Sequence, residues 1–240
     1  MDQTFEHIYH ALEEKNWWFV ARRKIILQLL KDAAPKNKIL DYGCAGGPLL
    51  EDLRVQGFRN LSGVDISAEA IALCQKRGLS DTFVVTGTSA PFADASFDWI
   101  IASDVLEHIQ QEADMLAEWK RLLKPGGRLI VFVPAFSFLW SVHDKRNHHF
   151  RRYTRAELRQ KTEAAGFAVT RSSYWNFFLF GPVYLARLGR KKDTGAGDLK
   201  EVPSWVNRGL VALFGLEHAL LKFMNLPFGV SVFLIAQKNV

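Results

Sequence analysis

Two carboxylates follow short apolar segments, in positions where they could bind a nucleoside. The first apolar segment ends in Asp41, and the turn after it contains Gly43 and Gly47. Glycine lets a ligand approach the backbone closely, because it has no side chain. A second apolar segment, 61–64, ends in Asp65, whose carboxylate can accept hydrogen bonds from both hydroxyls of a ribose. The pattern therefore predicts a nucleoside site where two strands end.

The turn at 43–47 is unsuited to a pyrophosphate. A dinucleotide fingerprint requires three glycines at a spacing that places the pyrophosphate on a helix N-terminus, and this turn lacks that spacing. No Lys-Ser or Lys-Thr pair follows, which excludes a phosphate-binding P-loop. The carboxylate of Asp41 would repel a pyrophosphate but suits a cationic ligand. S-adenosylmethionine is a nucleoside with a positive charge and no phosphate.

With these motifs, the chain resembles the class I S-adenosylmethionine-dependent methyltransferases of the small-molecule type. The first motif of that family is an acidic residue followed by alternating glycines, and it maps to Asp41, Gly43, Ala45 and Gly47. Ala45 replaces the middle glycine, and we expect its φ to be negative. The family's acidic residue at the end of the second strand maps to Asp65.

The resemblance covers residues 38 to 134. The stretches 96–109 and 122–129 match the later motifs of the family, whereas Thr86 stands where the family usually has an aspartate. The resemblance implies that the chain binds S-adenosylmethionine and releases S-adenosylhomocysteine. The cofactor-binding residues that it implies are Asp41, Gly43, Cys44, Ala45, Gly47, Asp65, Ile66, Thr86, Gly87, Thr88, Ser103, Asp104 and Val105.

Short, strand-like apolar segments alternate with helical segments along the chain. This alternation predicts an α/β fold with a doubly wound, mostly parallel sheet. We expect strands at 39–40, 63–64, 82–85, 99–102, 128–133, 167–175 and 230–237, and helices at 47–56, 67–78, 110–123 and 155–165. By resemblance, the sheet is Rossmann-like with seven strands, the last of them antiparallel. Ligands bind at the carboxyl ends of the strands in such sheets. We therefore expect the residues at these ends to line one crevice: Asp41, Asp65, Thr86, Ser103 and Asp104.

The N-terminal segment, residues 1–35, reads as helical with a break near Asn16. Residues 36–175 and 229–240 form the predicted core. The N-terminal segment either packs on this core as a structural helix or acts as a lid over the ligand. As a lid, Trp17 would cover the pocket and Arg22 would meet a carboxylate of the cofactor or the substrate.

Residues 176–228 form a predicted apolar, helical insert. It has a flexible linker at 193–198, and neither half reaches the roughly 18–20 uninterrupted apolar residues that a membrane span needs. Three interpretations stay open: a cap over the pocket, a homodimer contact, and a surface that dips into lipid. In the last case the basic run 190–192 would face the headgroups.

Methyl transfer from a sulfonium is a direct displacement, so a base is needed only for a hydroxyl or an acidic carbon acceptor. His108 follows Asp104 by four residues, and a helix starting at residue 105 would place both on one face. His143 and His149 lie after the fifth strand, where the family places its acceptor-binding loops. These three histidines are the candidate catalytic bases, with structural roles as the alternative.

The same segment after the fifth strand offers candidates for binding the acceptor, namely His148, Arg152 and Tyr153. A guanidinium can bind an anionic group through two hydrogen bonds. The alternative is a solvated loop or one that caps the sheet. No spacing of histidines and acids here is strong enough to predict a metal site.

The composition narrows the class of partner. The net charge of +6 is modest, and the basic residues form short clusters without a stacking platform, which disfavours nucleic acid as substrate. Two cysteines disfavour a disulfide scaffold and a zinc site, and Cys44 reads as a small residue in the turn. Residues 1–15 lack the apolar core of a signal peptide. We therefore expect a cytoplasmic location, with peripheral contact to the inner face of a membrane under the lipid interpretation.

These observations lead to one main hypothesis of function. The chain would methylate oxygen or carbon of a small, partly hydrophobic acceptor, such as an isoprenoid, a quinone precursor or a lipid-linked glycan. A module that binds S-adenosylmethionine without catalysis is the alternative. A nicotinamide-dependent oxidoreductase is disfavoured by Asp41 and by the missing pyrophosphate turn.

Overall fold

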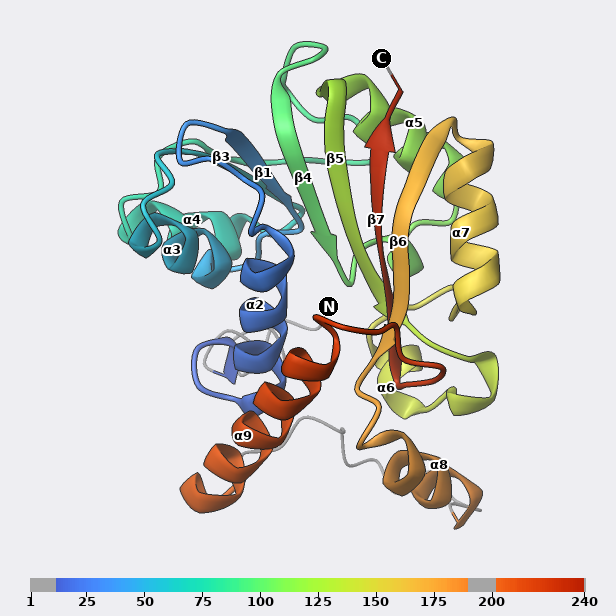
Figure 1. The fold of residues 1–240 in the computed structure, drawn as a ribbon. Coiled ribbons are helices and arrows are strands. Elements are labelled where there is room, and N and C mark those ends of the chain that lie inside the picture. Colours follow the sequence, from blue (N-terminus) through green and yellow to red (C-terminus); the bar gives the residue numbers. More distant parts are fainter. Residues whose placement is uncertain (1–11, 190–201, 240) are drawn as a thin grey trace.

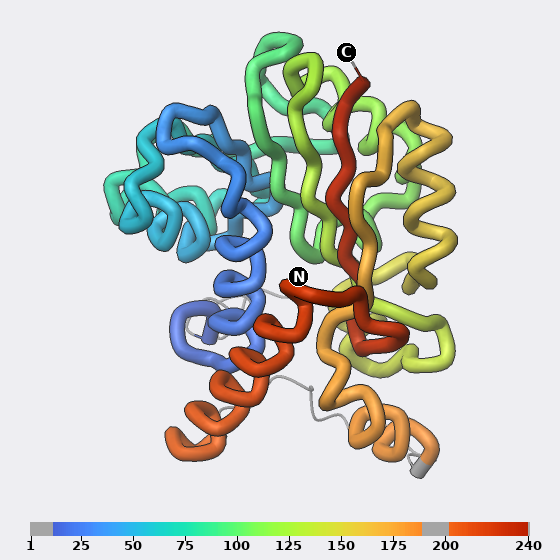
Figure 2. The backbone as a smooth tube through the Cα atoms, viewed as in Figure 1, coloured from blue at the N-terminus to red at the C-terminus, as the bar shows by residue number. Residues whose placement is uncertain are grey.

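Seven strands form one sheet in the order β3-β2-β1-β4-β5-β7-β6 (Figures 1 and 2). The computed structural model describes residues 12–189 and 202–239. The strands are β1 (Lys38–Tyr42), β2 (Asn60–Asp65), β3 (Thr82–Val84), β4 (Phe97–Ser103), β5 (Leu123–Pro134), β6 (Phe167–Trp175) and β7 (Ser231–Lys238). Strand β7 runs antiparallel to both β5 and β6, and β1 to β5 are parallel. The predicted α/β class, strand number and antiparallel last strand are confirmed.

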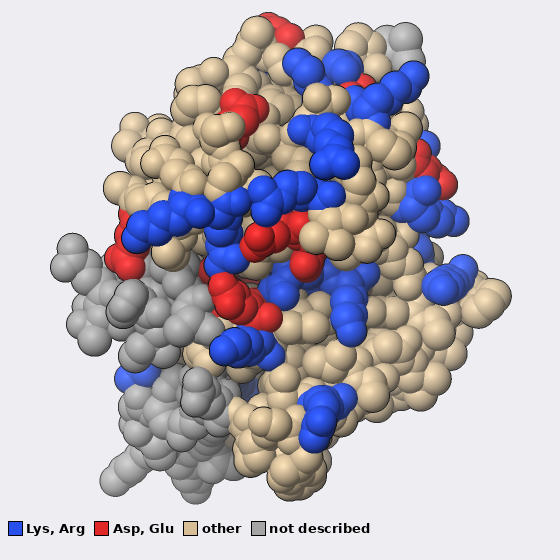
Figure 3. Space-filling view, turned by 90° about the vertical axis from the view of Figure 1, so that its left-hand side faces the viewer, with Lys and Arg blue, Asp and Glu red and all other residues tan. Residues whose placement is uncertain are grey.

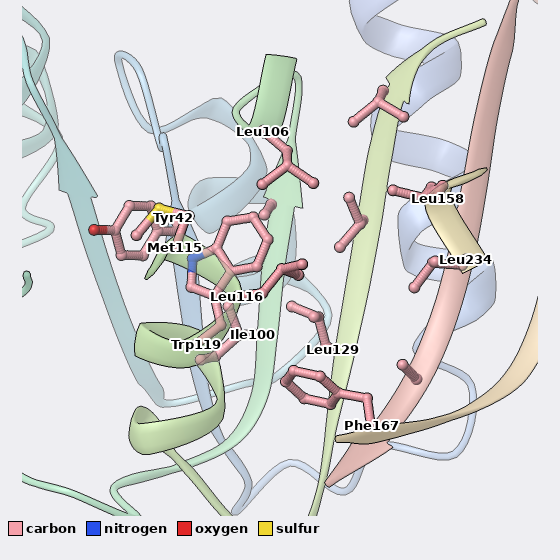
Figure 4. Packing of buried hydrophobic residues seen from close by; sticks show 14 of the residues in the cluster. Tyr42, Ile100, Leu106, Met115, Leu116, Trp119, Leu129, Leu158, Phe167 and Leu234 are labelled. Carbon is pink, nitrogen blue, oxygen red and sulfur yellow. The ribbon is translucent and has the colours of Figure 1, made fainter. Parts of the chain in front are cut away.

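Helices cover both faces of the sheet. They are α2 (Trp17–Leu29), α3 (Pro48–Val55), α4 (Ala68–Lys76), α5 (Glu112–Leu122), α6 (Val142–Arg146), α7 (Arg155–Ala164), α8 (Phe180–Gly189) and α9 (Ser204–Leu220). Two short 3-10 turns are η1 (Leu106–His108) and η2 (Ser137–Leu139). Apolar residues of α2, α3, α4 and α9 join one buried cluster, and those of α5 and α7 join the other. Figure 4 shows Trp119 and Leu116 of α5 beside Ile100 of β4.

Helix α7 shows how local sequence sets an element's ends. Thr154 accepts a hydrogen bond from the Glu157 amide, and Glu157 accepts one in return from the Thr154 amide, which forms a capping box. Gly166, at φ +84°, follows the C-cap and allows the left-handed conformation that ends the helix. Both ends of this helix were predicted from the sequence and are confirmed.

A helix starting at residue 105, which would place Asp104 and His108 on one face, does not form. Only the 3-10 turn η1 forms there, and Asp104 adopts φ +57°, which no α-helical residue does. Asp104 and His108 therefore do not share a helical face. The turn instead directs Glu107 inward, where it is buried.

Helix α2 packs along α9, so the N-terminal segment and the second half of the insert lie side by side (Figure 1). Trp17 stacks on Phe214 with 5.5 Å between ring centroids, and its amide donates to Asn207 Oδ1 at 2.7 Å. Asn16 caps α2, which confirms the predicted break. The linker 193–198, the basic run 190–192 and residues 1–11 lie outside the described residues. Within the described ranges, none of the helices has both the length and the apolar character needed to cross a bilayer.

Glu217 anchors α9 to the core. It is fully buried and accepts hydrogen bonds from the amides of Asn176 at 2.7 Å and Phe177 at 3.0 Å, just after β6. Replacing Glu217 with alanine leaves these amides unpaired, and we expect the free energy of unfolding to fall by about 2–3 kcal/mol. Urea denaturation measures this. As a control, Glu163→Ala removes an exposed pair with Arg159 and should change it by less than about 0.5 kcal/mol. Equal effects of the two variants would contradict the anchoring role.

Candidate active site

The residues predicted to line the crevice lie at or just after the carboxyl ends of β1, β2 and β4, and α2 lies beside this end of the sheet (Figure 1). The turn after β1 is tied to β2, because the amides of Gly43 and Cys44 both donate to the Val64 carbonyl, at 2.8 and 3.0 Å. Gly43 and Gly47 have φ of +82° and +83°. These values require glycine or a strained residue.

Ala45 also has a positive φ, of +47°, so the expectation of a negative value is wrong. Two hydrogen bonds explain how an alanine holds this conformation. Its amide donates to Asp65 Oδ2 at 2.8 Å, and the amide of Gly46 lies 3.4 Å from Glu13 Oε2. The carboxylates around the turn therefore fix its shape from outside.

Gly43 and Gly47 allow side chains of the same protein to approach the turn closely, in addition to any ligand. A Cβ on Gly43 would lie 2.5 Å from Val105 Cγ2, and one on Gly47 would lie 2.7 Å from Leu79 Cδ1. Gly47 thus allows α3 to pack near the end of α4. Cys44 is buried beneath β2, and hydrogen bonding to Cys74 together with burial raises the pKa of its thiol. A protonated, buried thiol agrees with Cys44 as a small packing residue.

Asp65 is held rigidly at the end of β2. Its two carboxylate oxygens accept from the amides of Ala45 at 2.8 Å and Ser67 at 2.9 Å. Each oxygen can accept a further hydrogen bond, so the carboxylate can still receive ribose hydroxyls. The next side chain, Ile66, is 76% exposed and offers an apolar surface to a flat ring.

The loop after β3 is joined to the end of β1. Tyr42, at the end of β1, donates from its hydroxyl to the Thr88 carbonyl at 3.0 Å. Gly87 has φ +73°, and Thr86 is exposed. The loop is therefore fixed through Thr88, which leaves the Thr86 hydroxyl accessible from solvent.

Arg22 of α2 reaches the end of β4. Its Nη1 donates to Ser103 Oγ at 2.7 Å and to Asp104 Oδ2 at 2.6 Å. Its guanidinium lies about 5 Å from the rings of Trp18, Phe132 and Trp175, each within cation–π range. The sequence analysis assigned Arg22 to a ligand carboxylate, and in the structure a carboxylate of the same chain occupies that place. Trp17 faces α9 instead of the crevice.

Acidic side chains concentrate beside the turn. Asp41 is buried, and burial, followed by the charges of Asp65 and Glu13, raises its pKa to about 8. Glu13 was missed by the sequence analysis, since nothing in its polar surroundings distinguishes it. Three acids around one turn favour a cationic ligand.

The three histidines proposed as bases come together from segments 35 residues apart. The rings of His108 and His149 lie 4.5 Å apart between centroids, and those of His149 and His143 lie 6.0 Å apart. Burial, followed by the charge of His149, lowers the pKa of His108 to about 4. His108 is therefore neutral at neutral pH. His148, by contrast, is exposed and has φ +55°.

Arg152 and Tyr153 serve the fold in this arrangement. Arg152 donates to both carboxylate oxygens of Asp144, at 2.7 and 2.9 Å, and Asp144 also accepts from His149 Nδ1 at 2.9 Å. Although burial acts in the opposite direction, the hydrogen bonds from His149 and Arg152 hold the pKa of Asp144 below its usual range. Tyr153 is buried and donates to Glu112 at 2.8 Å. Neither side chain reaches an acceptor unless these contacts break.

Three comparisons with known proteins agree with this geometry. The profile of the family described as "Methyltransferase domain" matches residues 15–172. A protein of Mycolicibacterium smegmatis named "Probable S-adenosylmethionine-dependent methyltransferase" is 31% identical over 170 residues, which are 69% of this chain and 65% of that protein. A "Ubiquinone biosynthesis O-methyltransferase" of Xylella fastidiosa is 35% identical over 100 residues, 39% of this chain and 40% of that protein.

A solved structure shares the fold over its whole length. It is a SAM-dependent methyltransferase from Thermotoga maritima, with 20% identity, a TM-score of 0.62 and coverage of 100% of both chains. The chain spans less than two thirds of the length of both curated relatives described above.

Proposed function

Because this chain belongs to the class I S-adenosylmethionine-dependent methyltransferases, we propose that it methylates oxygen or carbon of a small, partly hydrophobic acceptor. The observation that carries the proposal is the rigid Asp65 beside a turn that is lined by acids. In this proposal Asp65 binds the ribose, and Ile66 and the loop 86–88 bind the adenine. Asp41 and Glu13 balance the positive charges of the methionine part.

The transfer needs few reacting groups from the protein. The acceptor atom attacks the methyl carbon, the bond from that carbon to sulfur breaks, and S-adenosylhomocysteine leaves as a neutral thioether. Positioning the acceptor in line with the methyl group and excluding water supply most of the rate. A hydroxyl acceptor also loses a proton. In this proposal a neutral imidazole among His108, His143 and His149 takes that proton.

The end of the molecule that carries α8 and α9 supports a partly hydrophobic acceptor. Large apolar side chains are exposed there, among them Leu185, Leu188, Trp205 at 73% and Phe223 at 88% exposure. Figure 3 shows a broad area with few charged side chains on the lower part of the face that it presents. The Xylella relative is named for ubiquinone biosynthesis, which accords with a quinone precursor as the acceptor. The same apolar end would also suit lipid or a second copy of the chain.

The pH dependence of cofactor binding tests the role of Asp41. In the free chain its pKa is about 8, and a cationic ligand binds best to the ionised carboxylate. As pH falls below 8, the affinity for S-adenosylmethionine should therefore weaken, by up to about tenfold per pH unit. Isothermal titration from pH 6 to 9, in buffers of different ionisation enthalpy, measures this together with the proton released.

The variant Asp41→Asn should flatten that pH profile. It should also stabilise the ligand-free chain at pH 8. Because the pKa of Asp41 is raised from its ordinary value of 3.8 to about 8 in the folded chain, the free energy of unfolding falls as pH rises between these two values. Asparagine, which does not ionise, avoids this loss. A profile that is unchanged in Asp41→Asn would contradict this role.

The acceptor class is tested with methyl-labelled S-adenosylmethionine and matched sets of acceptors. Quinone precursors, prenylated phenols and lipid-linked glycans form one set, and sugar nucleotides and free amino acids form the other. We expect label in the first set, with S-adenosylhomocysteine formed in equal amount. Transfer confined to the second set would overturn the proposed acceptor. Tight cofactor binding without transfer to either set, or to any fraction of a cell extract, would favour a non-catalytic module.

A further inference from the structure

Three side chains that could ligate a metal ion converge just beyond the end of β4. Glu107 and His108 come from η1, and His149 lies in the loop after α6. Each of the three offers a ligand atom, and these atoms all lie within 4.8 Å of one another. The amide of Phe150 donates to the Glu107 carbonyl at 2.8 Å, which holds the two segments together. The cluster is therefore part of the folded scaffold.

Glu107 has no partner for its carboxylate among the described residues. The residue is 1% exposed, and neither carboxylate oxygen has a hydrogen-bond partner there. The nearby cations Arg22 and Arg152 are each bonded to another carboxylate, Asp104 and Asp144. Burying a carboxylate without a partner costs several kcal/mol. A side chain of this kind, next to two imidazoles, points to a missing cation.

The imidazole of His149 is already oriented for ligation. Its Nδ1 lies 2.9 Å from Asp144 Oδ1, and because a carboxylate can only accept, Nδ1 carries the proton. The lone pair is then on Nε2. Asp144 is in turn fixed by two hydrogen bonds from Arg152. A carboxylate behind a ligating histidine is the usual support of protein metal sites.

His108 lies directly against His149. The two rings meet edge to face, with 4.5 Å between their centroids and an angle of 89° between their planes. Zinc binds such nitrogen and oxygen ligands at about 2.0–2.2 Å, which places tetrahedral ligand atoms about 3.4 Å apart, so the ligand atoms of each pair would need to approach by at most about 1.4 Å.

We propose that Glu107, His108 and His149 form a binding site for a divalent transition-metal cation. Two imidazoles and one carboxylate are the ligand set of catalytic zinc sites and of other first-row divalent ions, and they suit Mg²⁺ or Ca²⁺ less well. Three protein ligands leave at least one coordination position open. The sequence analysis predicted no metal site, because His149 follows His108 by 41 residues and no local spacing joins them.

The location of the site suggests what it does, an argument that rests on the proposed function. Asp104, at the edge of the cofactor crevice, precedes Glu107 by three residues. A cation there would bind an oxygen of the acceptor beside the methyl donor and would lower the pKa of a hydroxyl. With His108 and His149 as ligands, His143 is the candidate base that remains to take the proton of that hydroxyl. The acceptor would then be a molecule with a hydroxyl, which narrows the acceptor class to O-methylation.

Cation binding is tested on the tag-free, full-length chain without cofactor or acceptor. After treatment with EDTA and its removal, Zn²⁺ and Mn²⁺ are titrated by calorimetry, and Co²⁺ by its visible ligand-field absorption. We expect one saturable site, with Zn²⁺ tighter than Mn²⁺, and an increase in Tm on binding. Absence of saturable binding for all three ions would overturn the inference.

Two variants and one control assign the ligands. Glu107→Gln and His149→Gln should each weaken cation affinity by at least about tenfold. His148→Gln changes the neighbouring, exposed histidine and should leave the affinity unchanged. Because Glu107→Gln keeps the shape and removes a buried charge, its Tm without metal should not fall. Equal affinity of the Glu107→Gln variant and the unmodified chain would place the ion elsewhere.

Calorimetry with S-adenosylmethionine in the presence of EDTA separates the two proposals. Cofactor binding without any cation binding would leave the proposed function standing and reject the metal site. Cation binding without cofactor binding would reject the proposed function and leave the metal site standing.

Discussion

Replacing Asp65 with alanine should weaken the affinity for S-adenosylmethionine by about tenfold or more. The carboxylate is oriented by the amides of Ala45 and Ser67, so it is in place before a ribose arrives. Its loss removes the hydrogen bonds to the ribose. It also removes the bond that holds Ala45 at a positive φ. Calorimetric titration with S-adenosylmethionine and with S-adenosylhomocysteine measures the change.

The matched control for Asp65→Ala is Asp94→Ala. Asp94 is an exposed aspartate whose ion pair is with Arg121, far from the carboxyl ends of β1 and β2. Its removal should leave the affinity within about twofold. If Asp65→Ala binds the cofactor as tightly as Asp94→Ala, the ribose lies elsewhere and the assignment of the crevice is wrong.

Replacing Gly43 with alanine should lower the free energy of unfolding by about 2–4 kcal/mol. Two effects add. At φ +82° a side chain is strained, and the new Cβ would lie 2.5 Å from Val105 Cγ2. Relief requires the loop after β4 to move, so cofactor affinity should fall as well. Urea denaturation and cofactor titration of the same samples test both expectations.

Two further variants separate these effects. Gly87→Ala has a similar φ of +73° but nothing within 4 Å of the new Cβ, so only the backbone strain of about 1 kcal/mol should appear. The double variant Gly43→Ala with Val105→Ala should lose less stability than the sum of the single changes, because the overlap is gone. If Gly43→Ala and Gly87→Ala are equally stable, the contact with Val105 is unimportant.

Local patterns in the sequence were sufficient for most of the fold. The strand β6 spans Phe167–Trp175, as predicted, and the capping box at Thr154 starts α7 where expected. The class of ligand also followed from short-range features, namely Asp41, the turn after it, and Asp65. Apolar periodicity, capping and turn chemistry act over a few residues, so each can be recognised without knowing the rest of the chain.

The details of the crevice depended on contacts between distant segments. The Arg22–Asp104 pair joins residues 82 positions apart, and Trp17 meets Phe214 across most of the chain. Ala45 takes its positive φ because Asp65 holds its amide, and the helix expected at residue 105 is lost because Asp104 turns the other way.

Amino-acid order alone thus determined that this chain forms a mostly parallel sheet with a site for a cationic nucleoside, because those signals are local. Only the tertiary structure decided which polar groups support the fold and which remain for chemistry. Arg152 and Glu107 are both buried, ionisable residues in segments between two strands, yet the side chain of Arg152 is paired with Asp144 and the carboxyl group of Glu107 has no hydrogen-bond partner among the described residues. That difference depends on which side chains meet in space, and local sequence does not encode it.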